Sequence, residues 1–301
     1  AIPIILIQFL IEGLRWQFTS IIYFLPAMYI AHKLQHKDIN ITTKTLLAGW
    51  LTSSCLLLWV IPVFSLPSPG GNYSIGTEIH HWIDSSRAEL FTENESDLRQ
   101  IMIQMWYPAD LQNRKKPEPY MDYIELRAKT LAEAGGIPEF FPKHLNYIFT
   151  NSHLNAKVIS SKFKLPFLIF SHGITGSRHL HQTLYEYLAS RGIVVVALDH
   201  SYDANLTIFP DGSVADYRSN ITGHPDSLAL RKIQMDTRSN DISFIIDQMK
   251  KIQLGQIRSN LSNSLDLKRI AVGGHSYGGA TALVSSFQDH RITACIGLDP
   301  W

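Results

Sequence analysis

The amino-acid sequence predicts an α/β fold with a mostly parallel sheet, preceded by helices that span a membrane. Three observations predict it. Charged residues are scarce in residues 1–66 and ordinary in frequency afterwards. Past residue 100, short apolar runs rich in β-branched residues alternate with segments of helical periodicity. Two of these runs are apolar at nearly every position, which is typical of strands buried on both faces of a parallel sheet.

The composition excludes several classes of protein. The 301 residues are 45% hydrophobic and include 2 cysteines, 18 glycines and 14 prolines. This argues against a collagen-like, disordered or disulfide-scaffold protein. The formal net charge is +1, and the part after residue 66 is nearly neutral. We therefore expect no nucleic-acid partner.

Two uncharged runs near the start of the chain predict transmembrane helices. The longer run, residues 45–66, reads TLLAGWLTSSCLLLWVIPVFSL, and about 20 apolar residues span a bilayer as a helix. The shorter run, residues 16–32, contains Pro26, and the apolar residues 2–11 resemble the end of a further span. The alternatives are a buried helical hairpin or a signal peptide, and the second run is too long for the latter.

The lysines around these runs predict their orientation. Lys33, Lys37 and Lys44 lie between the two runs, whereas no Lys or Arg occurs between Leu66 and Arg87. The positive-inside rule places the 33–44 loop in the cytoplasm, so the rest of the chain lies outside it. The stretch LPSPGGNYS is typical of a linker, and we expect a linker over 67–75 and a soluble domain over 76–301.

The soluble part contains five predicted strands and the helices between them. The strands are 101–108, 166–173, 192–200, 268–276 and 291–299, all but the first read as buried parallel strands. Helices are expected over 179–192, around 242–252 and over 278–288. Residues 109–160 have no clean period, which indicates an irregular insertion or partial lid.

The segment Gly274-His275-Ser276-Tyr277-Gly278 matches the G-x-S-x-G nucleophile elbow of the α/β-hydrolase fold. It follows an apolar strand and precedes a helix with small residues at its start, which is the context this motif requires. Ser276 is the predicted nucleophile, and Gly274 and Gly278 let neighbouring backbone approach. The alternative is a glycine-rich turn without catalysis.

A second loop predicts the oxyanion hole. In this fold, the N–H after the nucleophile acts together with an N–H from the loop that follows an earlier strand. These two donors are Tyr277 and Ile174, the latter within Ser171-His172-Gly173-Ile174-Thr175-Gly176. We expect His172 and Gly173 to shape this loop rather than to take part in the chemistry.

Asp299 follows the last predicted strand and is the predicted triad acid, the alternative being a turn aspartate before Pro300. In this fold the order along the chain is Ser, Asp, His, and no histidine follows Asp299. His290 comes too early, and His200 and His275 are local alternatives that do not match the order. We therefore expect the triad histidine beyond residue 301, in a chain that is a C-terminally incomplete fragment with little activity alone.

Several segments resemble a known family: FSHGITGSR (170–178), LASRGIVVVALDH (188–200), GGHSYGGAT (273–281), GLDPW (297–301) and WYPAD (106–110). Over roughly residues 70–301 the chain is similar to the platelet-activating-factor acetylhydrolase, or lipoprotein-associated phospholipase A2, group of α/β-hydrolases. The resemblance implies calcium-independent hydrolysis of short or oxidised acyl chains from phospholipids. It also implies Asp299 as acid and Ile174 and Tyr277 as oxyanion donors. The fused spans resemble a bacterial branch of the family.

The resulting hypothesis is a multi-pass membrane serine ester hydrolase with its catalytic domain outside the cytoplasm. It acts on lipid or small ester substrates through an acyl-enzyme and needs neither a cofactor nor a metal. One alternative is a dienelactone-hydrolase-like or polyester-cleaving esterase. Another is a non-catalytic membrane receptor or binding module on a hydrolase fold.

Overall fold

The structure is a computed structural model that describes residues 15–34, 39–111 and 116–301. The chain divides into two compact units, residues 1–65 and 66–301, and each is described by itself. The apolar run 2–11, expected to end a further span, lies outside the described residues.

The first unit contains two long helices, α2 (Trp16–Leu34) and α3 (Ile41–Val60). Polar contacts join them: Ser20 Oγ lies 2.7 Å from Ser54 Oγ and accepts a 2.8 Å hydrogen bond from Trp50 Nε1. Among the described residues, α3 is the one helix long and apolar enough to cross a membrane. The second expected span, at 16–32, forms a helix but does not meet that test, so the expectation of several spans is supported for α3 alone.

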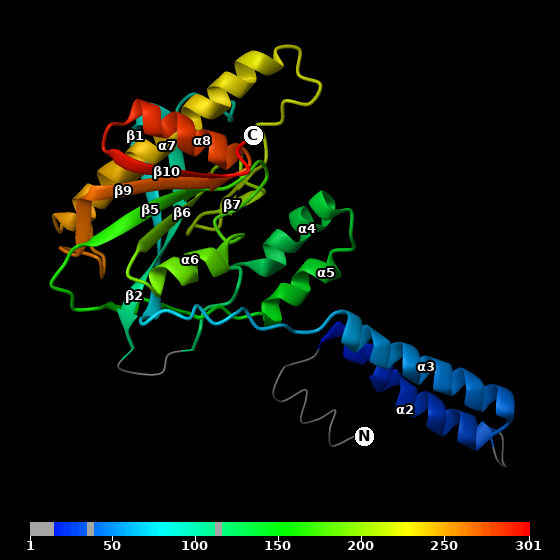
Figure 1. The fold of residues 1–301 in the computed structure, drawn as a ribbon. Helices are drawn as coiled ribbons and strands as arrows, with labels where there is room; N and C mark the ends of the chain where they lie inside the picture. Colours follow the sequence, from blue (N-terminus) through cyan, green and yellow to red (C-terminus); the bar gives the residue numbers. More distant parts are fainter. Residues whose placement is uncertain (1–14, 35–38, 112–115) are drawn as a thin grey trace. The chain divides into compact units, whose positions relative to one another are not determined.

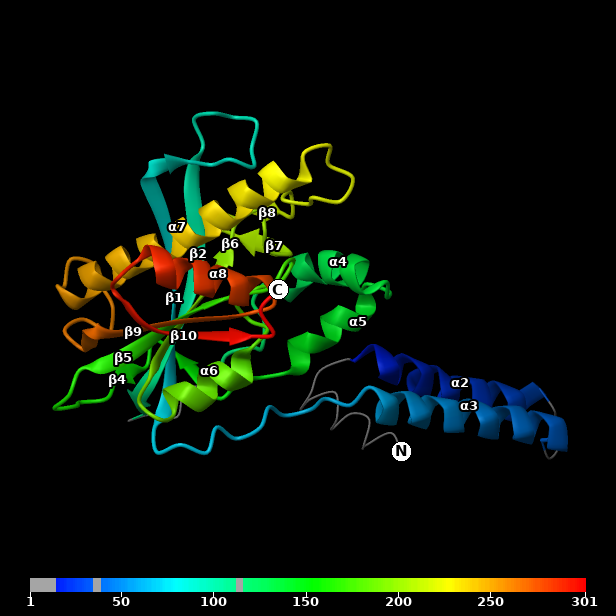
Figure 2. The same ribbon diagram turned by 45° about the horizontal axis from the view of Figure 1, so that its top comes forward.

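The second unit is built on an eight-stranded sheet in the order β10-β9-β5-β6-β2-β1-β3, with β4 paired to β2 (Figures 1 and 2). Strands β10, β9, β5 and β6 are parallel, whereas β2 runs antiparallel to both β6 and β1. The bounds are β1 Ser74–Ala88, β2 Leu98–Asp110, β3 Ser152–Leu154, β4 Lys157–Val158, β5 Leu165–Ser171, β6 Val194–His200, β9 Leu265–His275 and β10 Ile292–Leu298. A separate hairpin pairs β7 (Leu206–Ile208) with β8 (Val214–Asp216). The mixed sheet with its helices confirms the predicted α/β class.

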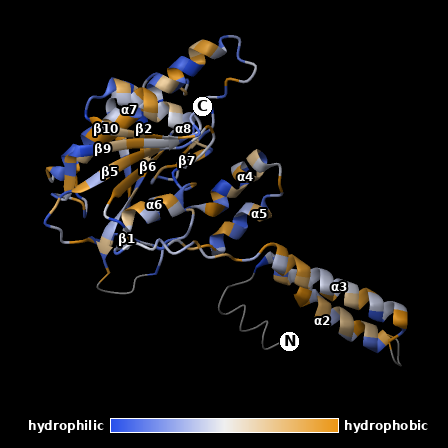
Figure 3. Cartoon of the chain, in the orientation of Figure 1, coloured by the Kyte–Doolittle hydropathy of each residue, from blue (hydrophilic) through white to orange (hydrophobic). Residues whose placement is uncertain are grey.

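Helices cover both faces of the sheet. Helix α6 (Gln182–Ala189) lies on one face, and α7 (Ser227–Gln253) and α8 (Tyr277–Gln288) lie on the other (Figure 1). Because successive strand residues point to opposite faces, β5 places Phe167 and Ile169 in the α7 core and Leu168 and Phe170 in the α6 core. The strands at the centre of the sheet are accordingly largely apolar in Figure 3.

Two regions differ from what the sequence predicts. The stretch 109–160, expected to be irregular, contains α4 (Ile124–Gly135), the short helices α5 (Phe140–Lys143) and η1 (His144–Tyr147), and strands β3 and β4. Strand β10, expected to be buried, is the edge of the sheet and is mostly exposed, since β9 is its one partner among the described strands.

Candidate active site

Ser276 lies in the sharp turn between β9 and α8. Its backbone has φ 54° and ψ −126°, and a positive φ is rare for a residue with a side chain. The Ser276 N–H donates to Leu298 O of the neighbouring strand at 2.9 Å. A Cβ on Gly274 would clash with the backbone of Gly278, so the turn can close this tightly only with glycine at position 274.

The loop after β5 passes directly against this turn. A Cβ on Gly278 would clash with the carbonyl oxygens of Ser171 and His172. A Cβ on Gly173 would lie 3.3 Å from Ser276 Cβ. Gly274 and Gly278 therefore stand where two backbone segments meet with no room for a side chain, and Gly173 stands where a side chain would make a tight contact.

The two predicted oxyanion donors flank Ser276. Tyr277 follows Ser276 at the start of α8, and Ile174 follows Gly173, where an added Cβ would lie 3.3 Å from Ser276 Cβ. Within the part of the chain that the structure describes, neither the Ile174 N–H nor the Tyr277 N–H donates a hydrogen bond. Both are thus available to a ligand oxygen, although their role stays a prediction.

Asp299 comes level with Ser276 because β9 and β10 are parallel and in register. Leu298 pairs with His275, so the next residue of each strand stands at the same edge of the sheet. Trp301 N–H also donates to Ser276 O at 3.3 Å. The Asp299 residue is exposed, and its backbone has φ 46°.

Each of the parallel strands β5, β6, β9 and β10 is followed, within four residues, by a non-glycine residue with positive φ. They are Thr175 after β5 (φ 54°), Tyr202 after β6 (64°), Ser276 after β9 (54°) and Asp299 after β10 (46°). Such residues cost stability and persist only where the surroundings hold them. The carboxyl edge of the sheet is the usual place for a binding site in an open α/β fold.

The described histidines near this edge do not supply a triad base in the expected order. His200 is fully buried, and its ring nitrogens are engaged by Ser171 Oγ at 2.9 Å and by Asp241 Oδ2 at 2.8 Å. His275 is exposed beside Ser276, and its ring packs against that of His181 with centroids 5.2 Å apart.

His290 precedes β10, whereas Ser276 and Asp299 stand at the opposite end of the strands. A strand of seven residues is about 20 Å long, which puts His290 out of reach.

Buried charges beneath the loop form a network that the sequence did not reveal. The Arg238 guanidinium binds the Asp203 carboxylate and donates to His172 O at 2.6 Å. Burial, and then the Arg238 charge, lowers the pKa of His172 to about 3. Burial alone would raise the pKa of Asp203, but Arg238 outweighs it and lowers this pKa to about 2.

A second buried network lies beside the first. Arg99 is 1% exposed and binds both Asp241, with Nη2–Oδ2 at 2.6 Å, and Glu89, with Nη1–Oε2 at 2.8 Å. Asp241 in turn holds His200, and burial followed by the Arg238 charge lowers the pKa of His200 to about 4. Arg238 and Asp241, two charged residues on the buried face of α7, are the sequence signal that could have indicated these networks.

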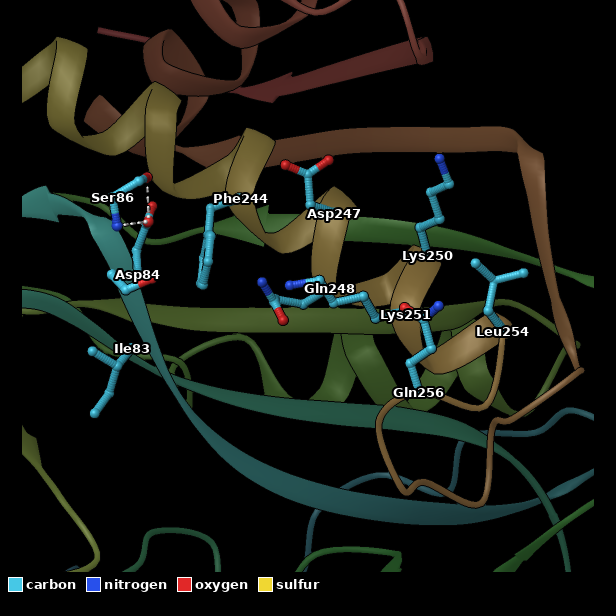
Figure 4. Close-up of a pocket in the computed structure, with 11 residues that line it drawn as sticks. Ile83, Asp84, Ser86, Phe244, Asp247, Gln248, Lys250, Lys251, Leu254 and Gln256 are labelled. Atoms are coloured by element: carbon cyan, nitrogen blue, oxygen red, sulfur yellow. Dashed lines mark hydrogen bonds between the residues drawn. The ribbon is translucent and has the colours of Figure 1, made fainter.

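A pocket of about 630 Å³ lies between β1 and α7 (Figure 4). Its lining is mostly polar, with Asp84, Ser86, Gln248 and Lys251, and also includes Ile83, Phe244 and Leu254. None of the predicted site residues lines it, so it is separate from the turn at Ser276.

Comparison with known proteins decides the family. The family described as platelet-activating factor acetylhydrolase, isoform II, matches residues 61–301. The chain belongs to this family. It is 27% identical, over 293 residues, to "Platelet-activating factor acetylhydrolase" of Cavia porcellus, which covers 90% of this chain and 64% of the relative. The chain thus spans less than two thirds of the length of that acetylhydrolase.

Other esterases are also similar to this member of the acetylhydrolase family. "Cutinase est1" of Thermobifida alba is 29% identical over 134 residues, which cover 44% of this chain and 34% of the cutinase. A solved structure of a ferulic acid esterase from Streptomyces cinnamoneus has a TM-score of 0.60 at 27% identity and covers 77% of this chain and 60% of its own. The predicted resemblance and the α/β esterase fold are both confirmed.

Proposed function

We propose that this chain carries the nucleophile, the acid and the oxyanion hole of a carboxylic ester hydrolase that releases short acyl chains from lipid esters. The observation that carries the proposal is the turn at Ser276, with φ 54°, two N–H groups without a partner among the described residues, and Asp299 level with it on the next strand. Membership of the acetylhydrolase family supports the same reaction class.

The proposed chemistry is acyl transfer through serine. A histidine base takes the Ser276 hydroxyl proton as the oxygen attacks the ester carbonyl, and the Ile174 and Tyr277 N–H groups bind the resulting oxyanion. The intermediate collapses, and the leaving alcohol takes the proton from the imidazolium. Water then attacks the acyl-serine with the same base, which releases the carboxylic acid and restores Ser276.

We propose that the base lies after residue 301. Both His200 nitrogens are already engaged, His290 is at the wrong edge of the sheet, and His275 is adjacent to the nucleophile itself. We expect the full-length protein to hydrolyse esters and residues 1–301 alone to show little activity. Full activity from residues 1–301 would contradict the assignment of the base.

The test of the nucleophile uses a fluorophosphonate probe and a short-chain ester on the full-length protein. Ser276→Ala should abolish both probe labelling and hydrolysis. Ser286→Ala, farther along α8, is the matched control and should change neither. Labelling that persists in Ser276→Ala would identify another nucleophile.

Two alternatives are separated by the same assay. The cutinase similarity supports a polyester-cleaving esterase, for which polymer or water-soluble short esters should be better substrates than an acetyl-glycerophospholipid. A non-catalytic binding module would leave the full-length protein unlabelled by the probe.

We also propose that α3 anchors the protein in a membrane, with the catalytic unit outside the cytoplasm. The support is the length and apolar composition of α3, together with Lys33 and Lys44 near the ends of the loop before it. A protease added to intact cells should remove the catalytic unit and leave the 33–44 loop protected.

A further inference from the structure

The Arg238 guanidinium holds the loop that carries the Ile174 N–H. Arg238 is fully buried. Its Nη1 donates to His172 O at 2.6 Å, its Nη2 lies 3.4 Å from Gly173 O, and its Nε binds the Asp203 carboxylate. One planar cation therefore binds two successive carbonyl groups of the loop.

The Gly173 carbonyl also accepts two other hydrogen bonds. His172 Nδ1 lies 2.6 Å from Gly173 O, and because a carbonyl only accepts, Nδ1 carries the proton. His172 Nε2 is then the acceptor for the His200 N–H at 3.1 Å, which agrees with a neutral ring. The Gly176 N–H donates to the same Gly173 oxygen at 3.0 Å.

This carbonyl belongs to the same peptide group as the Ile174 N–H. In a trans peptide the C=O and the N–H point in opposite directions. Donors at the oxygen therefore fix the direction of the N–H, and they polarise the peptide so that the N–H becomes a stronger donor.

Arg238 reaches the other predicted donor as well. Its guanidinium carbon lies 4.9 Å from the centroid of the Tyr277 ring. Asp203, its carboxylate partner, accepts the Thr175 N–H at its backbone oxygen at 3.3 Å. Arg238 thus contacts the segments on both sides of Ser276.

We infer that Arg238 is a positioning residue for the oxyanion hole, which orients and polarises the Gly173–Ile174 peptide without touching the substrate. This inference rests on the proposed ester hydrolysis, because the oxyanion hole acts only in that reaction.

The test compares two buried arginines in the full-length protein. Arg238→Gln should lower kcat for a short-chain ester by about 10- to 100-fold with little change in KM. It should weaken inhibition by a trifluoromethyl ketone, whose serine adduct carries an oxyanion, by the same factor. Arg99→Gln removes an equally buried cation that contacts no carbonyl of the loop 172–176, and it should leave the kcat and the ketone affinity within about threefold.

Arg238→Lys keeps the charge but cannot bind both carbonyls and Asp203 at once, so it should give an intermediate loss. It also carries the test if Arg238→Gln does not fold. Equal kinetic losses in the Arg238 and Arg99 variants, or a change confined to KM, would overturn the inference while the wild-type protein remained an esterase. A wild-type protein that neither hydrolyses the ester nor reacts with the fluorophosphonate probe would instead overturn the proposed function, and the inference with it.

Discussion

Gly173 is a residue of the loop after β5 that lies close to Ser276. A Cβ there would lie 3.3 Å from Ser276 Cβ and 3.5 Å from His275 O. Gly173→Ala should push the loop away and move the Ile174 N–H, which should lower kcat by about 100-fold, the order of losing one oxyanion donor. Steady-state kinetics together with a thermal unfolding curve measure the effect.

The control for this prediction is Gly135→Ala in α4. A Cβ at Gly135 meets Ile137 at 3.4 Å, an ordinary contact, and alanine favours a helix. Activity should be unchanged in this variant. Wild-type activity in Gly173→Ala would show that the close approach has no catalytic consequence.

At the scale of single residues, the sequence indicated the turn at Ser276 but not the buried charge networks of Arg238 and Arg99. The small residues around Ser276 all lie within residues 273–280, so a local pattern in the sequence indicated them. Arg238 lies 66 residues from His172 and Arg99 lies 142 residues from Asp241, and no local pattern reports such pairs. In the sequence, these pairs are visible only as charged residues among the apolar positions of α7.

Among the elements, α7 owes its position to a buried stripe of isoleucines. Ile245 is fully buried, whereas Ile233 on the same helix is 41% exposed. Ile245→Ala should lower the free energy of unfolding by about 3 kcal/mol because it leaves a cavity. Ile233→Ala should cost less than about 1 kcal/mol. Urea unfolding of the two variants checks this, and similar costs would contradict the assigned burial.

The buried histidines between β5, β6 and α7 make stability depend on pH. The pKa values of His172 and His200 are lowered to about 3 and about 4, below the usual value near 6.5. Below about pH 6.5 the unfolded chain binds protons that the folded chain does not. Stability should therefore fall as the pH drops from about 6.5 toward 4.

Melting temperatures measured from pH 7.5 to 4 test this dependence. Replacing the exposed His224 by Gln is the control and should leave the profile unchanged. A melting temperature that stays constant down to pH 4.5 would mean that the two rings are not held neutral by the fold.

The sequence predicted the central strands well and the margins of the sheet less well. Strands β5 and β6 are apolar at nearly every position, since both faces are covered. Strand β1 was missed because it lies toward the margin of the sheet and carries polar residues such as His80 and His81. Strand β10 is apolar like a central strand, yet it lies at the edge of the sheet. The pattern of its own residues does not distinguish an edge strand from a central strand.

At the scale of the whole molecule, the proposed membrane attachment depends on α3. Leu51 is exposed near the middle of this helix. A charge at the centre of a spanning helix is costly, so Leu51→Arg should shift the protein toward the soluble fraction. Leu254→Arg, an exposed leucine at the end of α7, should not. Alkaline carbonate extraction separates the two, and an unchanged membrane fraction in Leu51→Arg would contradict anchoring by α3.

The four residues with positive φ at the carboxyl edge of the sheet have a consequence for how this protein can change. Each of these backbone conformations lowers the stability of the fold by about 1–3 kcal/mol, and all four lie in one small region. Glycine at Thr175 or Tyr202 would relieve that cost and also loosen the turns that hold the site. Selection for heat resistance and selection for turnover would therefore compete at the same few positions, and variants gained under one should be lost under the other.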